Sequence, residues 1–195
     1  MPDIQKSCLV VVDVQGKLAQ LMSERERLFK NIQILIKAAK ILDIPIIWCQ
    51  QFPEGLGETV SEIAELMCDI EPINKVSFSC CGDEGFNIRL EEVGREHVIL
   101  CGIESHVCIY QTASDLYKRG YEVSVIGDAV SSRTAENKTI ALERMRNEGI
   151  IISSTEMVVF ELLRTAEHPK FRDCLLYTSD AADELDGVDL GGRRI

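Results

Sequence analysis

Three residues whose side chains can support nucleophilic catalysis each lie at the end of a short apolar run. Asp13 follows residues 8–12, Lys75 lies near the end of residues 72–76, and Cys108 comes shortly after residues 98–101. A thiol becomes a strong nucleophile when it loses its proton, an aspartate can accept that proton, and a nearby ammonium stabilises the negative charge. The three residue types together therefore indicate catalysis by a cysteine, provided that the fold brings them together.

The sequence around Cys108 predicts a strand, a tight turn and then a helix. Cys108 is expected at or just inside the helix N-terminus, where free N–H groups and the helix dipole lower the pKa of a thiol. We therefore expect Cys108 to react near neutral pH ahead of the other cysteines. Two alternatives remain open. Cys108 could be a small buried apolar residue, as many free cysteines are, or it could form a dyad with His106, although two residues along a turn seldom place an imidazole over a thiol.

Six short apolar runs alternate with amphipathic helical segments along the chain. This order predicts an α/β fold, a three-layer α/β/α doubly wound sheet of about six mainly parallel strands. Ligands of such sheets bind at the carboxyl ends of the strands, where Asp13, Lys75 and Cys108 are expected. The chain has neither a G-x-G-x-x-G turn nor a Walker loop, which argues against a phosphate-binding nucleotide site. The strands are expected at residues 8–15, 44–49, 72–76, 98–101, 121–126 and 150–153.

The composition is that of one globular domain, with 195 residues, 46% of them hydrophobic and 27% charged. The net charge of −11 argues against nucleic-acid partners and against binding to anionic membranes. The eight cysteines include no C-x-x-C pair, and the first residues lack the features of a secretion signal. We therefore expect a cytoplasmic protein with reduced thiols that acts on a small molecule.

The character of the sequence changes towards the C-terminus. Residues 174–184 read C-L-L-Y-T-S-D-A-A-D-E, which matches a translated adapter used in sequencing libraries, and residues 185–195 have no amphipathic period. We expect residues 1–173 to form the domain and residues 174–195 to be a non-native or disordered tail.

Three motifs resemble the isochorismatase-like cysteine hydrolases, and among them most closely the isochorismatase-domain-containing proteins. They are V-V-V-D-V-Q at residues 10–15, N-K-V-S-F-S at residues 74–79 and G-I-E-S-H-V-C-I-Y-Q-T-A at residues 102–113. The resemblance extends over about residues 7–173. It implies an isochorismatase-like fold in which Asp13 is the general base, Lys75 the cation that stabilises the thiolate and the transition state, and Cys108 the nucleophile.

The resemblance also implies a cis peptide bond between Ile103 and Glu104, which would direct backbone N–H groups at a developing oxyanion. Gln51, Phe52, Phe78 and His106 are predicted to line the substrate pocket. Homo-oligomers are expected because members of this family commonly assemble.

Metal-binding members of the same superfamily carry histidines between the second and third strands, and residues 48–74 contain none. We therefore expect no metal, no other cofactor and no nicotinamidase activity. The presence of Cys108 favours hydrolysis of a C–N bond, in a small amide or imide, through a thioester intermediate. One alternative is a binding or scaffold protein that keeps the fold without turnover. Another is a redox function that uses Cys80, Cys81 and Cys108.

Overall fold

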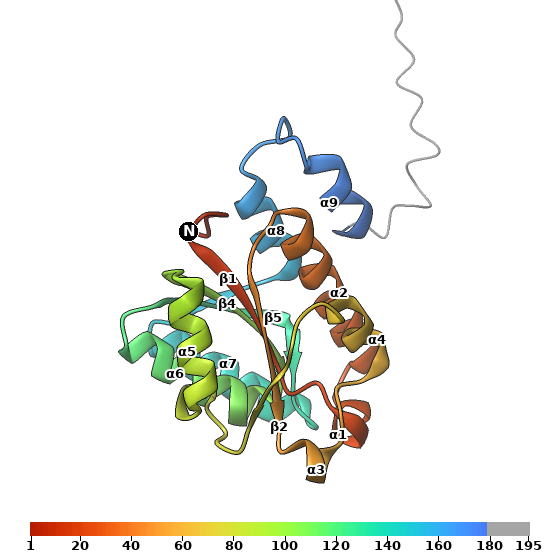
Figure 1. Ribbon diagram of the computed structural model, residues 1–195, viewed down its shortest axis with the longest axis vertical. Helices are drawn as coiled ribbons and strands as arrows, with labels where there is room; N and C mark the ends of the chain where they lie inside the picture. The colour runs from red at the N-terminus through yellow and green to blue at the C-terminus, as the bar shows by residue number, and fades with distance from the viewer. Residues whose placement is uncertain (179–195) are drawn as a thin grey trace, which may run out of the picture.

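In a computed structural model that describes residues 1–178, the chain folds into one parallel sheet with helices on both faces (Figure 1), which confirms the expected three-layer α/β fold. The strand order is β3-β2-β1-β4-β5-β6. The strands are β1 (Ser7–Val12), β2 (Ile46–Gln51), β3 (Ile73–Lys75), β4 (His97–Ile103), β5 (Glu122–Ser131) and β6 (Ile151–Ser153). The α-helices are α1 (Gly16–Gln20), α2 (Arg25–Ile41), α3 (Pro53–Leu56), α4 (Ser61–Ala64), α5 (Glu84–Val93), α6 (Tyr110–Lys118), α7 (Ala135–Asn147), α8 (Thr155–Leu163) and α9 (Phe171–Thr178). Three short turns of helix, η1 (Glu65–Met67), η2 (Cys80–Gly82) and η3 (Ser105–Ile109), complete the described elements.

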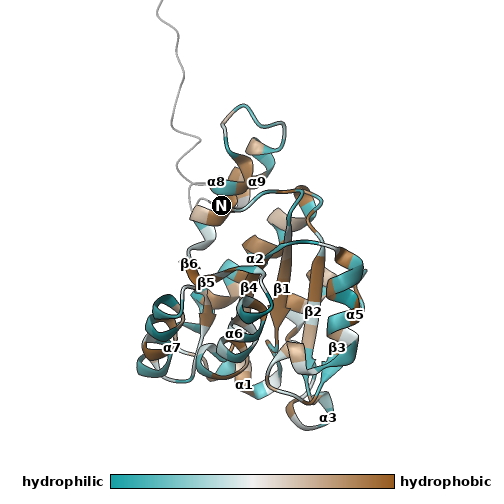
Figure 2. Ribbon diagram, turned by 90° about the vertical axis from the view of Figure 1, so that its left-hand side faces the viewer, coloured by the Kyte–Doolittle hydropathy of each residue, from teal (hydrophilic) through white to brown (hydrophobic). Residues whose placement is uncertain are grey.

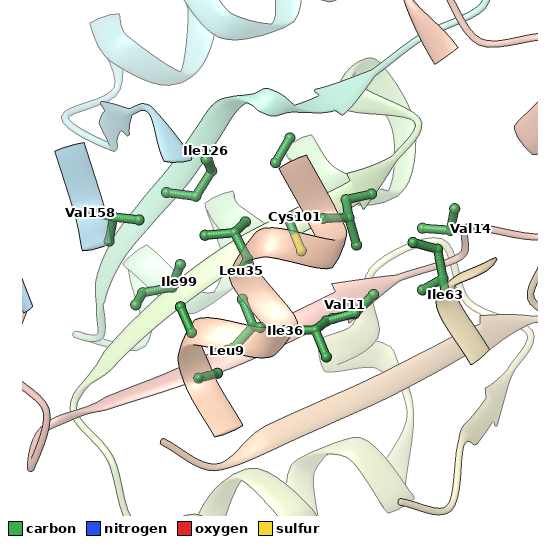
Figure 3. Packing of buried hydrophobic residues seen from close by; sticks show 14 of the residues in the cluster. Leu9, Val11, Val14, Leu35, Ile36, Ile63, Ile99, Cys101, Ile126 and Val158 are labelled. Atoms are coloured by element: carbon green, nitrogen blue, oxygen red, sulfur yellow. The ribbon is translucent and has the colours of Figure 1, made fainter. Parts of the chain in front are cut away.

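The central strands are buried on both sides, as their unbroken apolar sequences predict. Every residue of β1 and β4 is buried. One half of the core lies beneath α2, α4 and α8, where Leu35 and Ile36 of α2 pack over β1 and β4 (Figure 3). The other half lies beneath α5, α6 and α7, and Figure 2 shows the apolar strands between the two helical layers.

Strands β1 and β4 are neighbours at the centre of the sheet, although the first half of the chain separates them in sequence. The order of strands reverses between them, and in open α/β sheets the ligand-binding crevice forms at this reversal. Gly102 allows the close approach: its φ is +121°, and a Cβ added there would lie 2.0 Å from the carbonyl oxygen of Val12. The carboxyl ends of both strands lead towards α1 and α3, at the bottom of Figure 1.

Two strands are longer than their apolar runs suggest. The second extends to Gln51 instead of ending at Cys49, so Gln50 and Gln51 belong to the strand and not to the following loop. The fifth continues to Ser131 instead of ending at Ile126, with a shift of register against β4. In both places polar side chains extend a strand because hydrogen bonds satisfy them inside the protein.

The last described helix crosses the boundary expected after residue 173. Helix α9 contacts α2, and its residue Cys174 is buried in the core. Residues 179–195, the greater part of the expected tail, lie outside the described residues. Among the helices of residues 1–178, none is long and apolar enough to span a membrane.

A buried histidine lies at the amino edge of the sheet and predicts how stability depends on pH. His97 Nδ1 lies 3.2 Å from Ser7 Oγ and its Nε2 lies 2.8 Å from Ser124 Oγ. Burial lowers the pKa of His97. The unfolded chain therefore binds a proton below about pH 6.5 that the folded chain does not bind until lower pH.

We expect this difference to reduce the free energy of unfolding by up to about 1.4 kcal/mol for each pH unit below 6.5, until the pKa of His97 in the folded protein is reached. Urea unfolding of wild type and His97→Gln at pH 7.5, 6.5 and 5.5 measures the effect. The variant should lose this part of the dependence, and parallel curves for the two proteins would contradict the prediction.

Candidate active site

The structure brings Asp13, Lys75 and Cys108 together at the carboxyl edge of the sheet. Lys75 Nζ donates a hydrogen bond to Asp13 Oδ2 at 2.8 Å, and the Asp13 carboxylate also contacts the Cys108 thiol. Within residues 1–178, Asp13 Oδ1 is buried and has no hydrogen-bond partner. One carboxylate oxygen therefore binds the cation while the other is free to accept the proton of the thiol.

Asp13 leaves β1 in a left-handed conformation, with a φ of 57°. Aspartate adopts this conformation more readily than most residues. Its N–H donates to the carbonyl oxygen of Cys49 in the neighbouring strand, at 3.0 Å, and its carbonyl oxygen accepts from the N–H of Gln15. These bonds fix the Asp13 backbone at the carboxyl edge of the sheet, where β1 and β4 are neighbours.

Lys75 is the last residue of β3, and its side chain extends past the end of β2 to reach Asp13. It is among the largest fully buried side chains of the described chain, with 1% of its surface exposed. Its ammonium has four acceptors: Asp13 Oδ2, Gln51 Oε1 at 2.7 Å, and the carbonyl oxygens of Ser77 and Phe78 at 3.2 Å each. An ammonium held in this way stays charged although it is removed from water.

Burial and mutual attraction act in opposite directions on this ion pair. Burial raises the pKa of Asp13, and the neighbouring Lys75 ammonium only partly offsets the effect. Burial by itself lowers the pKa of Lys75, but the attraction of Asp13 and the effect of the neighbouring Cys80 and Cys108 outweigh it, so that the net shift is upward. Asp13 is consequently a stronger base than an exposed aspartate.

Cys108 lies in the π-helical turn η3, directly before α6. Burial and the nearby Asp13 charge raise the pKa of its thiol, and Lys75 opposes them without cancelling them. The expectation of a thiol with a lowered pKa is therefore wrong. The helix N-terminus does not dominate here, because the thiol is desolvated and its nearest charged neighbour is an anion.

The turn that precedes Cys108 contains the cis peptide bond between Ile103 and Glu104 that the resemblance implied. The carbonyl oxygen of Glu104 accepts hydrogen bonds from the N–H groups of Val107 and Ile109, which anchors the turn to η3. The Glu104 carboxylate is nearly buried and accepts two hydrogen bonds from Arg133, at its backbone N and at Nε, both 3.1 Å. Arg133 therefore ties the segment after β5 to the turn that precedes Cys108.

The four residues expected to line a pocket lie at this edge in different environments. Phe52 and Phe78 are half exposed beside the site. His106 Nδ1 lies 2.9 Å from Ser132 Oγ, while Asp13 and Lys75 are the charged groups that act most strongly on Cys108, which favours Asp13 over His106 as its base. The Gln51 amide is hydrogen-bonded to Lys75 Nζ and to the carbonyl oxygen of Val76, so within the protein it contacts the ammonium.

Two buried cysteines, Cys49 and Cys80, lie side by side near the site, and nothing in the sequence indicated that they meet. Cys49, on β2, forms a side-chain hydrogen bond with Cys80, on η2, and this contact and burial raise the pKa of Cys49. Burial also raises the pKa of Cys81 to about 11. All eight cysteines are free. Protonated, buried thiols exchange slowly, which weighs against the redox alternative.

A search for metal-binding groups covers only the described part of the chain. Within residues 1–178, no three His, Cys, Asp or Glu side chains are grouped closely enough to hold a metal ion.

Known proteins share both the sequence pattern and the architecture. The isochorismatase domain family model matches residues 7–157. Isochorismatase domain-containing protein 2 of Danio rerio is 39% identical over 168 residues, which are 86% of this chain and 84% of that protein. The secreted isochorismatase effector Isc1 of Phytophthora sojae is 36% identical over 191 residues, 96% of this chain and 91% of the relative.

Solved structures agree with this assignment. A structure described as MAR1 ribonuclease from Caenorhabditis elegans superposes with a TM-score of 0.86 and 35% identity, over 98% of this chain and 99% of the other. The YcaC gene product of Escherichia coli, described as an octameric hydrolase of unknown specificity, shares the fold with a TM-score of 0.82, 22% identity and coverage of 94% and 97%. The family model covers most of this chain, and the two relatives are 36% and 39% identical to it over most of their own length. The chain therefore belongs to the isochorismatase family and has its hydrolase fold.

Proposed function

We propose that this protein is a cysteine hydrolase that cleaves the C–N bond of a small amide or imide through a thioester on Cys108. The observation that carries the proposal is the Asp13 carboxylate, which lies beside the Cys108 thiol and binds Lys75 through Oδ2, while its buried Oδ1 has no hydrogen-bond partner in the described residues. This geometry suits a base that removes the thiol proton during attack. A preformed thiolate is not needed, because proton transfer and S–C bond formation occur together.

In the first half of the reaction, the Cys108 sulfur attacks the carbonyl carbon and its proton passes to Asp13. The carbonyl oxygen becomes an oxyanion, for which the N–H groups of Glu104 and Cys108 are the proposed donors. The buried Lys75 charge stabilises the negative charge of the intermediate. The C–N bond then breaks and the nitrogen takes the proton from Asp13. The amine departs, and the acyl group remains bound to Cys108 as a thioester.

Water completes the cycle in the second half. Asp13 takes a proton from a water molecule as its oxygen attacks the thioester carbon. The tetrahedral intermediate collapses, the C–S bond breaks, and the Cys108 sulfur regains a proton from Asp13. The products are a carboxylic acid and an amine, and the enzyme returns to its starting protonation state.

The ribonuclease description of the C. elegans structure suggests a different substrate. RNA is a polyanion whose binding requires a positively charged face. The net charge of −11 disfavours such a substrate here. An uncharged or weakly charged small molecule is the better match to a site with a buried, internally neutralised ion pair.

Assembly and location form part of the same proposal. The octameric state described for the E. coli protein supports a homo-oligomer for this chain as well. Eight free thiols support a reducing compartment such as the cytoplasm, although the P. sojae relative is described as secreted.

The proposal is tested by incubating the protein with a panel of small amides and imides and measuring both amine release and protein mass. We expect turnover of at least one compound and, after rapid acid quenching, an added acyl mass on the peptide that contains Cys108. Cys108→Ala should show neither result while it keeps the circular dichroism spectrum of wild type.

Two outcomes would reject the hydrolase. Turnover by Cys108→Ala would remove the thioester mechanism. Saturable binding of a compound without amine release or an adduct would favour the non-catalytic binding or scaffold protein.

A further inference from the structure

The mechanism above does not use Gln51, a buried polar residue that contacts Lys75. Gln51 is the last residue of β2, and its backbone and side chain both have hydrogen-bond partners. Its Oε1 accepts from Lys75 Nζ at 2.7 Å, and its Nε2 donates to the carbonyl oxygen of Val76 at 2.6 Å. Because each end of the amide has a distinct partner, its orientation is fixed with the oxygen towards the ammonium.

A second glutamine holds Gln51 in place. The Gln51 N–H donates to Gln15 Oε1 at 2.6 Å, and Gln15 Nε2 donates to the carbonyl oxygens of Gln51 at 3.0 Å and Gly57 at 2.7 Å. Gln15 is fully buried and lies two residues after Asp13. The turn that carries the base therefore also fixes the residue that contacts the cation.

Four acceptors surround the three N–H groups of the Lys75 ammonium, and they differ in kind. Asp13 is the charged one, whereas Gln51 Oε1 gives the shortest contact and is neutral. The two carbonyl oxygens are more distant, at 3.2 Å. A buried ammonium that loses its best neutral acceptor binds its proton less firmly, because burial favours the uncharged amine.

We propose that Gln51 is a positioning residue that keeps the Lys75 ammonium charged and directed at Asp13 and Cys108. It acts through Lys75 and does not touch the substrate. The expected effect of Gln51 on turnover rests on the proposed function. Its effect on the Lys75 ammonium does not depend on whether the protein is a hydrolase.

The titration of Lys75 measures this effect directly. The ionisable groups around it are Asp13 after β1, Cys49 on β2, Cys80 on η2 and Cys108 on η3. The pKa of the Lys75 amine is followed by NMR of protein with ¹³C-labelled lysine, with Lys75→Met identifying the signal. In Gln51→Met we expect this pKa to fall by about one to two units, a tenfold to hundredfold change in the ionisation constant, since a hydrogen bond to a charged group is lost.

The neighbouring glutamine supplies a matched control. Gln50 is also buried on the same strand, but its amide accepts from the N–H and hydroxyl of Thr59 and donates to Asn74. Gln50→Met removes a comparable set of hydrogen bonds without contacting Lys75. Its Lys75 titration should match that of wild type, and equal shifts in the two variants would overturn the proposal.

A second variant keeps the test valid if Gln51→Met does not fold. Gln51→Glu has nearly the same shape and adds a negative charge beside the ammonium, so the pKa of Lys75 should rise instead of falling. If the protein turns over an amide, the alkaline limb of kcat/KM should move in the same directions, down for Gln51→Met and up for Gln51→Glu. A shifted titration without any turnover would reject the hydrolase and leave the role of Gln51 standing, whereas an unshifted titration would reject that role.

Discussion

Asp13→Asn is expected to reduce amide hydrolysis by about 10²–10⁴-fold and, at the same time, to make Cys108 react faster with an alkylating reagent at neutral pH. The two effects have opposite signs because Asp13 has two opposing influences. In the proposed mechanism it is the base that removes the thiol proton during attack. As an anion beside the thiol it helps to keep the pKa of Cys108 raised in the resting protein.

Replacing the carboxylate with an amide removes both influences and leaves Lys75 charged. The ammonium keeps its neutral acceptors, Gln51 Oε1 and two carbonyl oxygens, and the Cys108 thiolate becomes the anion that can pair with it. The pKa of Cys108 should therefore fall, and alkylation by iodoacetamide between pH 6 and 9 should begin at lower pH than in wild type.

Cys68 provides the internal standard for this measurement, because it is exposed while the other seven cysteines are buried. Its rate should be the same in both proteins. Slower alkylation of Cys108 in Asp13→Asn would show that Asp13 promotes a resting thiolate, and the mechanism of concerted proton removal would then be wrong.

Lys75→Met should have the largest effect on stability. It leaves the Asp13 carboxylate buried without its cation, and breaking a buried ion pair by removing one partner costs about 3–5 kcal/mol. Asp13 is then expected to take up a proton, so that it can no longer accept one from Cys108, and turnover should be lost. Urea unfolding and the amide assay measure the two effects.

The double variant Asp13→Asn/Lys75→Met separates loss of charge pairing from loss of packing. Because it contains neither buried charge, its free energy of unfolding should exceed that of Lys75→Met, although its activity stays lost. Losses of stability that simply add in the double variant would mean that Asp13 and Lys75 are not coupled.

The sequence sufficed for the sheet and for the meeting of the three catalytic candidates, because both follow from local rules. Unbroken apolar runs that alternate with amphipathic helices specify a parallel sheet, and the carboxyl ends of its strands share one edge. Asp13, Lys75 and Cys108 each follow or end such a run, so local patterns alone placed all three at that edge.

What the sequence could not provide was the partner of each polar group. Gln50 and Gln51 end the apolar run of β2 and resemble the start of a loop, yet both are buried because Thr59 and Lys75 satisfy their amides. The state of Cys108 was missed for the same reason. A helix N-terminus is visible in a sequence, whereas the Asp13 carboxylate beside the thiol depends on the pairing of β1 with β4.

The pairing of β1 with β4 also divides the site between two halves of the chain. The base, the cation and Gln51 all come before residue 76, and the nucleophile and the turn that holds it come after residue 102. Asp13, Lys75 and Gln51 contact one another within the first half, whereas the contact between Asp13 and Cys108 joins the two halves. A shift of one half against the other would alter the Asp13–Cys108 contact together with the β1–β4 pairing, so we expect turnover to depend on how the two halves pack against each other.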